Sequence, residues 1–300
     1  MTTADERAAT LAAQPLVPLG TRSTLLRGTV DSARQVWAYR ELLGLLVRRE
    51  VKVRYKDSSL GMLWTLIRPL VMLTVYYFVI GRFLGAQRAI PDFAVYVFTG
   101  LTAYGLFSEI VSSGTGSILG NAGLVKKVSL PREVFPLSSV GSGLFTFGVQ
   151  LAVLVAATLA VQRFPTGERW LYFPLAVGLL LVWGTALALL LSAVNVYLRD
   201  VQYLVEVGLV VLFWTTPTLY SWELLTGEVT ARWVQELYLA NPVALAVLGM
   251  QRVFWVAGDA VAVPADLGTR MLVVTAVGLV ALWGAHRVFT RLEGDFAQEL

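Results

Sequence analysis

Long apolar stretches separated by short polar segments dominate the chain. A hydrocarbon core roughly 30 Å thick requires about 20 mostly apolar helical residues to cross it. Stretches of about that length occupy residues 62–84, 93–113, 137–161, 171–194, 203–220 and 271–290. This pattern predicts an all-α integral membrane protein with six transmembrane helices.

The polar segments predict an orientation. Lysines and arginines concentrate before residue 61, and others follow the second, fourth and sixth apolar stretches. Basic residues mark the cytosolic loops of membrane proteins, so we expect both termini in the cytosol. Residues 1–30 and 295–300 are predicted to be cytosolic tails, the first of them disordered.

Residues 31–57 predict an amphipathic helix along the cytosolic membrane face, within an interface segment of residues 31–60. An apolar side would carry Trp37, Leu42, Leu45 and Leu46. Such helices bury their apolar side at the headgroups and offer cations to anionic lipid. The cations near its end are Arg48, Arg49, Lys52, Arg54 and Lys56. A plain basic anchor with no further role is the alternative.

Arg68 and Pro69 interrupt the first apolar stretch near its start. A charge in hydrocarbon is costly and is tolerated mainly when it is paired or faces water. The predicted topology brings Glu109 and Glu206 to a similar depth, so we expect Arg68 to pair with one of them. Snorkelling of Arg68 to the headgroups is the alternative.

The loop between the second and third stretches, "SILGNAGLVKKVSLPREVFP", has glycines at one end and prolines at the other. These breakers predict a short amphipathic helix on the cytosolic side. It is either a docking element for another protein or a plain connector. The residues of interest are Asn121, Leu124, Lys126, Lys127, Pro131 and Arg132.

Residues 221–270 form a long external segment rich in apolar and aromatic residues. Asn241 followed by Pro242 predicts a helix start, with Asn as the cap and Pro at the first helical position. The helix over 241–257, which ends near Phe254 and Trp255, is short for a span and too apolar for water. We expect it to be re-entrant or interfacial in the outer leaflet.

Aromatic residues are numerous in and beside the apolar stretches. Rings can form belts at the membrane interfaces or line a path on which sugars stack. Candidates for such a path are Trp64, Tyr76, Phe83, Tyr104, Trp214 and Tyr220.

Composition agrees with a membrane protein and excludes several chemistries. The 300 residues are 56% hydrophobic and 15% charged, and the chain has no cysteine and a single histidine, His286. Soluble domains carry about 25% charged residues. Thiolate chemistry, a metal site built on several histidines and a Ser/His/Asp set are therefore not expected. The sequence also lacks a G-x-x-x-x-G-K-[ST] phosphate loop, so no catalytic, metal or cofactor site is predicted in this chain.

Four stretches together resemble the permease subunits of ABC-2 type polysaccharide exporters. The first contains the family pattern as Arg54, Tyr55, Ser58, Leu60, Gly61, Trp64 and Pro69. The others are "NAGLVKKVSLPREVFP", "NVYLRDVQYLVEVGLVVLFWTTPTLY" and "LANPVALAVLGMQRVFW". The ordered similarity covers about residues 40–290.

The resemblance implies a homodimer in the bacterial inner membrane, working with two copies of a separate ATPase that binds ATP and Mg. The exporter domain would cover residues 61–294, with two external gate helices in about 228–257. The Asn121–Arg132 loop would dock on the ATPase, and spans 1 and 5 would line the path. The cargo would be a polysaccharide on polyprenyl diphosphate, for which the five cations named above and Arg68 are candidate ligands. Membrane lipids are further partners, and nucleic acid is not one.

Two alternatives differ in function. An ABC-2 exporter of a small lipophilic molecule would share the architecture without needing a continuous hydrated channel. A membrane-embedded glycan-processing enzyme would require an acid, His or Cys cluster near a membrane surface, which the sequence does not offer.

Overall fold

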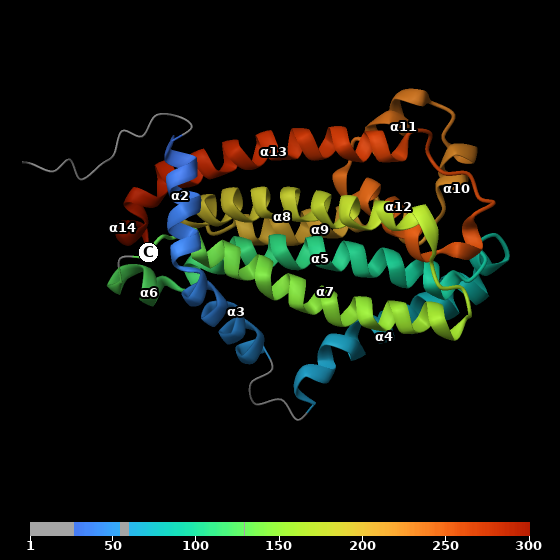
Figure 1. The fold of residues 1–300 in the computed structure, drawn as a ribbon, viewed down its shortest axis with the longest axis horizontal. Coiled ribbons are helices and arrows are strands. Elements are labelled where there is room, and N and C mark those ends of the chain that lie inside the picture. Colours follow the sequence, from blue (N-terminus) through green and yellow to red (C-terminus); the bar gives the residue numbers. More distant parts are fainter. Residues whose placement is uncertain (1–26, 55–59, 129) are drawn as a thin grey trace, which may run out of the picture.

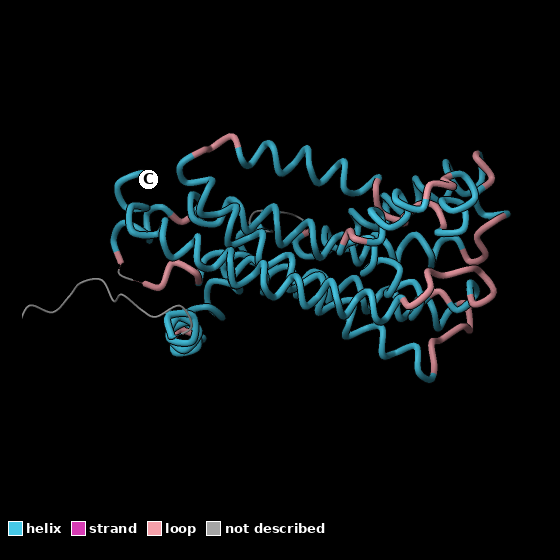
Figure 2. The backbone as a smooth tube through the Cα atoms, turned by 90° about the horizontal axis from the view of Figure 1, so that it is seen from above, coloured by secondary structure: helices cyan, strands magenta, loops and turns pink. Residues whose placement is uncertain are grey.

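The computed structural model describes residues 27–54, 60–128 and 130–300, and every regular element in these ranges is helical. Long helices run side by side along one axis, with short helices and loops at the two ends (Figures 1 and 2). Among the described residues, five helical segments are long and apolar enough to span a membrane: Trp64–Phe83 (α4 and the π-helical η2), α5 (Phe93–Gly120), α7 (Val134–Ala160), Gly167–Tyr197 (η4 and α8) and Leu267–Asp295 (α13 and η6). The predicted all-α membrane fold is confirmed.

The predicted span over 203–220 is shorter than expected. α9 (Val201–Trp214) has only 14 residues, or about 21 Å of helix. The chain then turns at Thr216, Pro217 and Thr218, where proline cannot continue the helical hydrogen bonds. The Thr216 hydroxyl donates to the Phe213 carbonyl and so occupies one of the last carbonyls of α9.

α5 is the central helix of the bundle and is held there by close packing. A Cβ added at Gly114 would lie 2.5 Å from the Cβ of Ala188 on α8 (Tyr172–Tyr197), and one added at Gly143 of α7 would lie 3.0 Å from Ile110. Small residues allow helix axes in membranes to approach closely. α5 therefore packs on α7 along one side and on α8 along another.

The segment after α9 folds into α10 (Trp222–Glu228), α11 (Arg232–Leu239) and α12 (Pro242–Phe254). As predicted, the Asn241 side chain caps α12, accepting from Val243 N at 3.0 Å. α12 bends by 80° from α11 and is buried along nearly its whole length among α5, α8 and α13 (Leu267–Leu292). α12 therefore packs within the bundle, as its continuous apolar run from Val243 to Met250 favours, and its depth in the membrane stays a prediction.

The predicted helix over 31–57 is two helices, α2 (Arg27–Ala38) and α3 (Arg40–Arg54), so the chain is already helical within the predicted tail 1–30. α2 crosses the bundle (Figure 1). α3 packs on α7, where a Cβ at Gly141 would lie 2.5 Å from Val47. Leu46 is buried, whereas Trp37 and Leu45 stay exposed. The predicted single helix is therefore wrong, while burial of Trp37 and Leu45 at the headgroups stays a prediction.

The remaining short elements complete the two ends of the bundle. They are η1 (Gly61–Leu63), η3 (Ala86–Arg88), α6 (Ala122–Lys127), η4 (Gly167–Leu171), η5 (Val256–Gly258), η6 (Glu293–Asp295) and α14 (Phe296–Glu299). Phe296 is fully buried, so the segment predicted to be a C-terminal tail is docked. α14 lies at the α6 end of the bundle, opposite the α11 end (Figure 1).

Candidate functional site

A polar cleft of about 510 Å³ opens near the α6 end, lined by residues of α3, α5, α7 and α9. We name it the polar cleft. Its polar lining residues are Arg49, Glu50, Arg54, Ser112, Ser113, Ser117, Asn121, Ser139 and Gln202. Three of its serines come from α5 and one from α7, both of membrane-spanning length, and buried hydroxyls need hydrogen-bond partners. The cleft is the strongest candidate site in the part of the chain that the structure describes.

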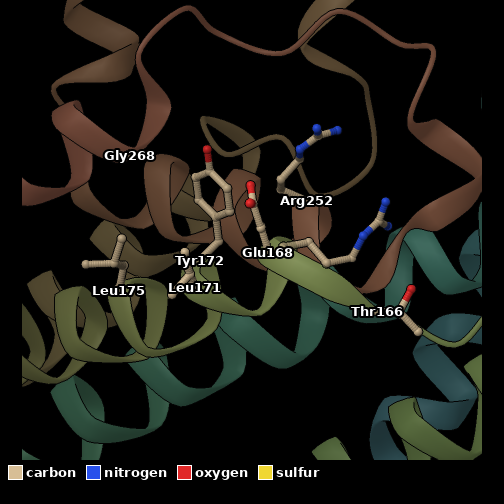
Figure 3. Close-up of a pocket in the computed structure, with 8 residues that line it drawn as sticks. Thr166, Glu168, Leu171, Tyr172, Leu175, Arg252 and Gly268 are labelled. Carbon is tan, nitrogen blue, oxygen red and sulfur yellow. The ribbon is translucent and has the colours of Figure 1, made fainter.

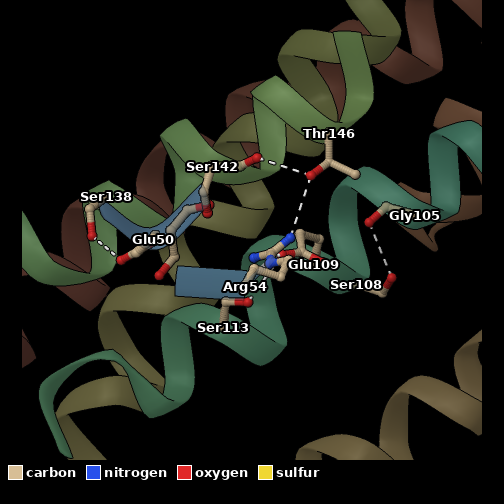
Figure 4. Close-up of polar contacts among 10 residues, drawn as sticks. Glu50, Arg54, Gly105, Ser108, Glu109, Ser113, Ser138, Ser142 and Thr146 are labelled. Carbon is tan, nitrogen blue, oxygen red and sulfur yellow. Dashed lines mark hydrogen bonds and ion pairs between the residues drawn. The ribbon is translucent and has the colours of Figure 1, made fainter. Parts of the chain in front are cut away.

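Arg54 anchors the end of α3 to α5 in this cleft (Figure 4). Its guanidinium forms an ion pair with Glu109 and donates to the Thr146 hydroxyl of α7 at 3.4 Å. The Glu109 carboxylate also accepts from Ser113 at 3.2 Å. Both charged side chains are about a quarter to a third exposed, so the pair is shielded from water yet remains reachable from the cleft.

This geometry corrects the expected pairing of Arg68. Glu109 pairs with Arg54, and Glu206 accepts from Gln202 at 3.3 Å. Arg68 itself is exposed and pairs with no residue that the structure describes. The physical reason is that little of the α4 surface is buried against the bundle. By contrast, the Arg54 side chain at the end of α3 contacts both α5 and α7.

Two further contacts fasten α3 beside the cleft. Ser138 of α7 donates to the Glu50 carboxylate (Figure 4), and burial raises the pKa of Glu50 against the opposing effect of the Ser138 hydrogen bond. Arg49 donates to the Asn121 side chain at 2.8 Å, and Asn121 in turn donates to the Ser117 carbonyl. α3 is thereby tied directly to the residue that precedes α6.

The cleft retains hydrogen-bonding capacity. Ser117 Oγ and Gln202 Oε1 are buried and have no partner within the described residues. Unpaired buried polar atoms are costly. A ligand rich in hydroxyl groups, or water, would satisfy them.

The predicted short helix in the loop after α5 is confirmed as α6. Val125 is buried beneath it, whereas Leu124, Lys126 and Lys127 are exposed. Pro131 and Arg132 are partly buried, and the Arg132 guanidinium lies over the Phe296 ring at 5.8 Å. α6 thus offers an apolar and basic face at one end of the bundle, while α14 supports it from behind.

A second polar cluster, absent from the sequence-based prediction, joins three elements at the same end. Glu133, just before α7, accepts from Ser32 of α2 at 2.8 Å and lies 3.7 Å from His286 of α13. Burial tends to raise the pKa of Glu133, but the His286 and Ser32 contacts lower it below the usual value. The cluster fastens α2 across the ends of α7 and α13.

The predicted path-lining aromatics divide into two groups. Tyr76 of α4 stacks with Phe213 of α9 at 6.1 Å between centroids, and Tyr104 of α5 meets the same ring at 5.1 Å. Trp214 adjoins this cluster and is exposed, as are Trp64 and Phe83 at the two ends of the first span. The cluster binds α4, α5 and α9 together and leaves the outer faces of α4 and α9 uncovered in the single chain.

Tyr220 belongs to a hydrogen-bonded turn at the α11 end. The buried Tyr96 hydroxyl contacts the carbonyls of Pro217 and Tyr220, and Gln251 of α12 donates to the Pro217 carbonyl at 2.7 Å. Tyr238 donates to the Tyr220 hydroxyl at 3.3 Å. This network ties the turn after α9 to α5 and α12.

The predicted gate residues Phe254 and Trp255 are anchors of the fold. Phe254 is buried against Trp170 and Phe173. Trp255 donates to the Pro91 carbonyl at 2.6 Å and packs on Tyr96. Neither ring is free to line a path in this conformation.

Sequence reasoning placed Arg54, Arg49, Asn121 and Glu109 among the candidates but missed the α7 side of the cleft. Ser138, Ser142 and Thr146 recur at four-residue spacing within an apolar span, which places them on one helix face. That stripe was the available signal. Lys56 lies outside the described residues, and Arg48 and Lys52 are exposed on α3.

Comparison with known families decides the class of protein. The model of the family described as "ABC-2 type transporter" matches residues 41–255, which cover α3 to the end of α12. The chain belongs to this ABC-2 type transporter family. With its long apolar helices, this ABC-2 protein is an integral membrane transport subunit.

Three curated relatives show the reach of the similarity. The ABC-2 chain is 33% identical over 268 residues to an O-antigen export system permease protein of Myxococcus xanthus, covering 89% of this chain and 98% of the relative. It is 28% identical over 215 residues to an O-antigen export system permease protein of Klebsiella pneumoniae, covering 71% and 80%. A polysialic acid transport protein of Escherichia coli is 30% identical over 150 residues, covering 49% and 54%.

Proposed function

We propose that this ABC-2 chain is the membrane subunit of an ATP-driven exporter that carries a polysaccharide linked to polyprenyl diphosphate across the bacterial plasma membrane. The observation that carries the proposal is the similarity to an O-antigen export permease over 98% of that relative's length. The sequence has no phosphate loop, so ATP and Mg would be bound by two copies of a separate ATPase chain.

The α6 end supplies the contact with the ATPase. The exposed Leu124, Lys126 and Lys127 form a small apolar and basic face suited to a cleft with acidic edges. Movement of α6 would reach α3 through the Arg49–Asn121 hydrogen bond and α5 through the Arg54–Glu109 pair. Both links border the polar cleft, so closure of the ATPase pair would change the shape of the cleft.

The geometry sharpens the choice of ligands for the diphosphate. Arg49 and Arg54 already have side-chain partners within the chain, Asn121 and Glu109 respectively. Arg48, Lys52 and Arg68 are exposed, and none has an ion-pair partner among the described residues. Cations with all their N–H donors free bind phosphate more readily than cations whose donors are already taken by other side chains. We therefore assign the diphosphate to Arg48, Lys52 and Arg68, with Arg54 as a structural residue.

The path would run between two copies of the chain, along the exposed faces of α4 and α9. Both helices carry an exposed charge within an apolar segment, Arg68 on α4 and Glu206 on α9. Charges inside a membrane require water or a partner, and a hydrated route between two copies would provide the water. By contrast, the exposed face of α13 from Leu272 to Trp283 carries no charge, as expected for a surface covered by lipid.

Cells lacking this chain provide the test. We expect them to accumulate the lipid-linked polymer on the cytosolic side, and complementation with the wild-type chain and its ATPase to restore surface polymer. Replacement of the phosphate-loop lysine of the ATPase should abolish the rescue. If the polymer reaches the surface unchanged in the deletion strain, the polysaccharide assignment is wrong.

A direct measurement concerns the coupling helix. Lys126→Glu with Lys127→Glu should weaken co-purification of the ATPase roughly tenfold, because it reverses the charge of the docking face. Lys52→Glu, on α3, is the matched control, and the ATPase should remain bound. Equal binding by both variants would exclude α6 as the dock.

A further inference from the structure

A second pocket lies at the α11 end, far from the polar cleft. It has a volume of about 580 Å³ and is bounded by η4, the start of α8, the end of α12 and the start of α13 (Figure 3). Its polar lining consists of Thr166, Glu168, Arg169, Tyr172 and Arg252. None of these residues takes part in the proposed transport path.

Two arginines in this pocket share a single carboxylate. Arg169 donates to Asp259 at 2.6 Å, and Arg252 donates to the other oxygen of Asp259 at 3.3 Å. Arg169 Nη1 is buried and has no partner within the described residues. The shared carboxylate leaves one positive charge in excess and several guanidinium N–H groups available, which is the donor arrangement that binds phosphate.

A free carboxylate sits on the same rim. Glu168 is exposed and forms no ion pair with any residue that the structure describes. Figure 3 shows its carboxylate, the Tyr172 hydroxyl and the Arg252 guanidinium projecting to the same side of the chain. The charges of the two arginines, Asp259 and Glu168 therefore sum to zero, and Glu168 is not paired with either arginine.

The wall below this rim is apolar. Leu171 and Leu175 line the pocket; Leu171 is two-thirds exposed, and Leu272 on α13 is also exposed. An exposed apolar surface of this kind beside a membrane-length helix faces acyl chains. The pocket therefore joins a charged rim to a lipid-facing wall, which is the arrangement of an interfacial lipid site.

We propose that this pocket binds the headgroup of a zwitterionic phospholipid of the phosphatidylethanolamine type. The phosphodiester would accept hydrogen bonds from Arg169 and Arg252, and the primary ammonium would lie at Glu168. A site with no net charge favours a zwitterion over an anionic lipid, because the anion leaves Glu168 unbalanced. The diphosphate of the proposed cargo is also anionic, so Glu168 would repel it as well. Lipid binding in this pocket does not require the proposed export function to be correct.

The test uses the purified full chain in detergent, with lipid binding measured by native mass spectrometry. Phosphatidylethanolamine should bind about tenfold more tightly than phosphatidylglycerol, the size expected for one charge-assisted contact. Arg252→Gln should weaken phosphatidylethanolamine binding about tenfold. Arg88→Gln, which removes an exposed arginine of η3 with no ion-pair partner among the described residues, should change nothing.

Glu168→Gln keeps the proposal falsifiable if Arg252→Gln does not fold, because Glu168 makes no ion pair with any described residue. It should abolish the preference for phosphatidylethanolamine over phosphatidylglycerol without weakening the latter. Soluble glycerophosphoethanolamine, which keeps the phosphodiester and the ammonium, should compete at least about 100-fold less well than the lipid, since it lacks acyl chains. Equal wild-type affinity for both lipids, or a preference unchanged in Glu168→Gln, would overturn the headgroup site. Equal competition by glycerophosphoethanolamine would overturn the lipid assignment.

Discussion

α4 and α5 are consecutive helices of nearly the same hydropathy with opposite surroundings. Yet 11% of the most apolar part of Trp64–Phe83 is buried, against 67% of the most apolar part of Phe93–Gly120. α5 presents Gly114 and Gly100 to its neighbours, whereas α4 presents large side chains outward. Hydropathy therefore predicts that a segment spans the membrane, whereas glycines at close helix contacts distinguish the buried central helix α5 from the exposed α4.

The same contrast separates two kinds of exposed surface. α13 is exposed but uncharged across its middle, while α4 and α9 are exposed and carry Arg68 and Glu206. Lipid can cover the first kind at no cost, and water or a second protein chain must meet the second. The predictions below test this contrast in order of expected effect.

The largest effect is expected at the centre of α5. Gly114→Val should destabilise the protein by about 3 kcal/mol or more, because its Cβ would lie 2.5 Å from the Cβ of Ala188 on a packed helix. Yield of monodisperse protein and the thermal midpoint report the loss. Gly208→Val on α9, with nothing within 4 Å of its Cβ, should leave both unchanged. Equal midpoints would show that α5 is not tightly packed.

The Arg54–Glu109 pair comes next. Arg54→Glu or Glu109→Arg alone should cost about 2 kcal/mol, less than the cost of breaking a fully buried pair because both side chains retain some contact with water. The combined swap should recover at least half of the thermal midpoint lost in the single variants. Glu109→Arg combined with Arg68→Glu should recover nothing. Recovery of the thermal midpoint in the Glu109→Arg and Arg68→Glu combination would support the Arg68–Glu109 pair expected from the sequence instead.

A smaller effect on stability, with a large effect on export, is expected for the exposed charges. Arg68→Gln and Glu206→Gln should keep the thermal midpoint within about 2 °C of wild type, since neither group forms an ion pair with a described residue. Surface polymer should fall about tenfold if each charge serves a hydrated path. Leu279→Gln on α13 is the matched control and should not impair export. Normal export in both charge variants would contradict a path along α4 and α9.

The smallest effect concerns Glu50. Its pKa is raised by burial, so the folded chain binds a proton more readily than the unfolded chain. The associated stability is present below the ordinary pKa of a glutamate and is lost as the pH rises through the raised value. Wild type should therefore melt about 2 °C below Glu50→Gln at pH 7.5 and level with it near pH 4. A wild-type advantage at pH 7.5 would contradict the raised pKa.

The sequence predicted which residues form helices better than it predicted which helices pack against one another. Spans, the α6 helix and the Asn241–Pro242 start of α12 follow from local composition and capping, which depend on adjacent residues. Burial of α12 inside the bundle was not predictable from its hydropathy, because an interfacial helix of equal length has a similar composition.

The candidate site shows the same limit. Arg68 was expected to pair with Glu109 or Glu206, but Arg54, on a different helix, takes Glu109. The choice depends on how α3 packs against α7 at Gly141. That contact joins segments almost a hundred residues apart, and no local pattern encodes it.

Because the chain has no cysteine, one introduced thiol reports the surroundings of a single position. The central claim is that the faces of α4 and α9 meet water between two copies. Val207→Cys on α9 should react with a charged, membrane-impermeant maleimide during ATP turnover, whereas Val280→Cys on α13 should stay unlabelled in lipid. Both positions are exposed in the single chain, so exposure alone does not separate them. Equal protection of Val207→Cys and Val280→Cys would contradict the account.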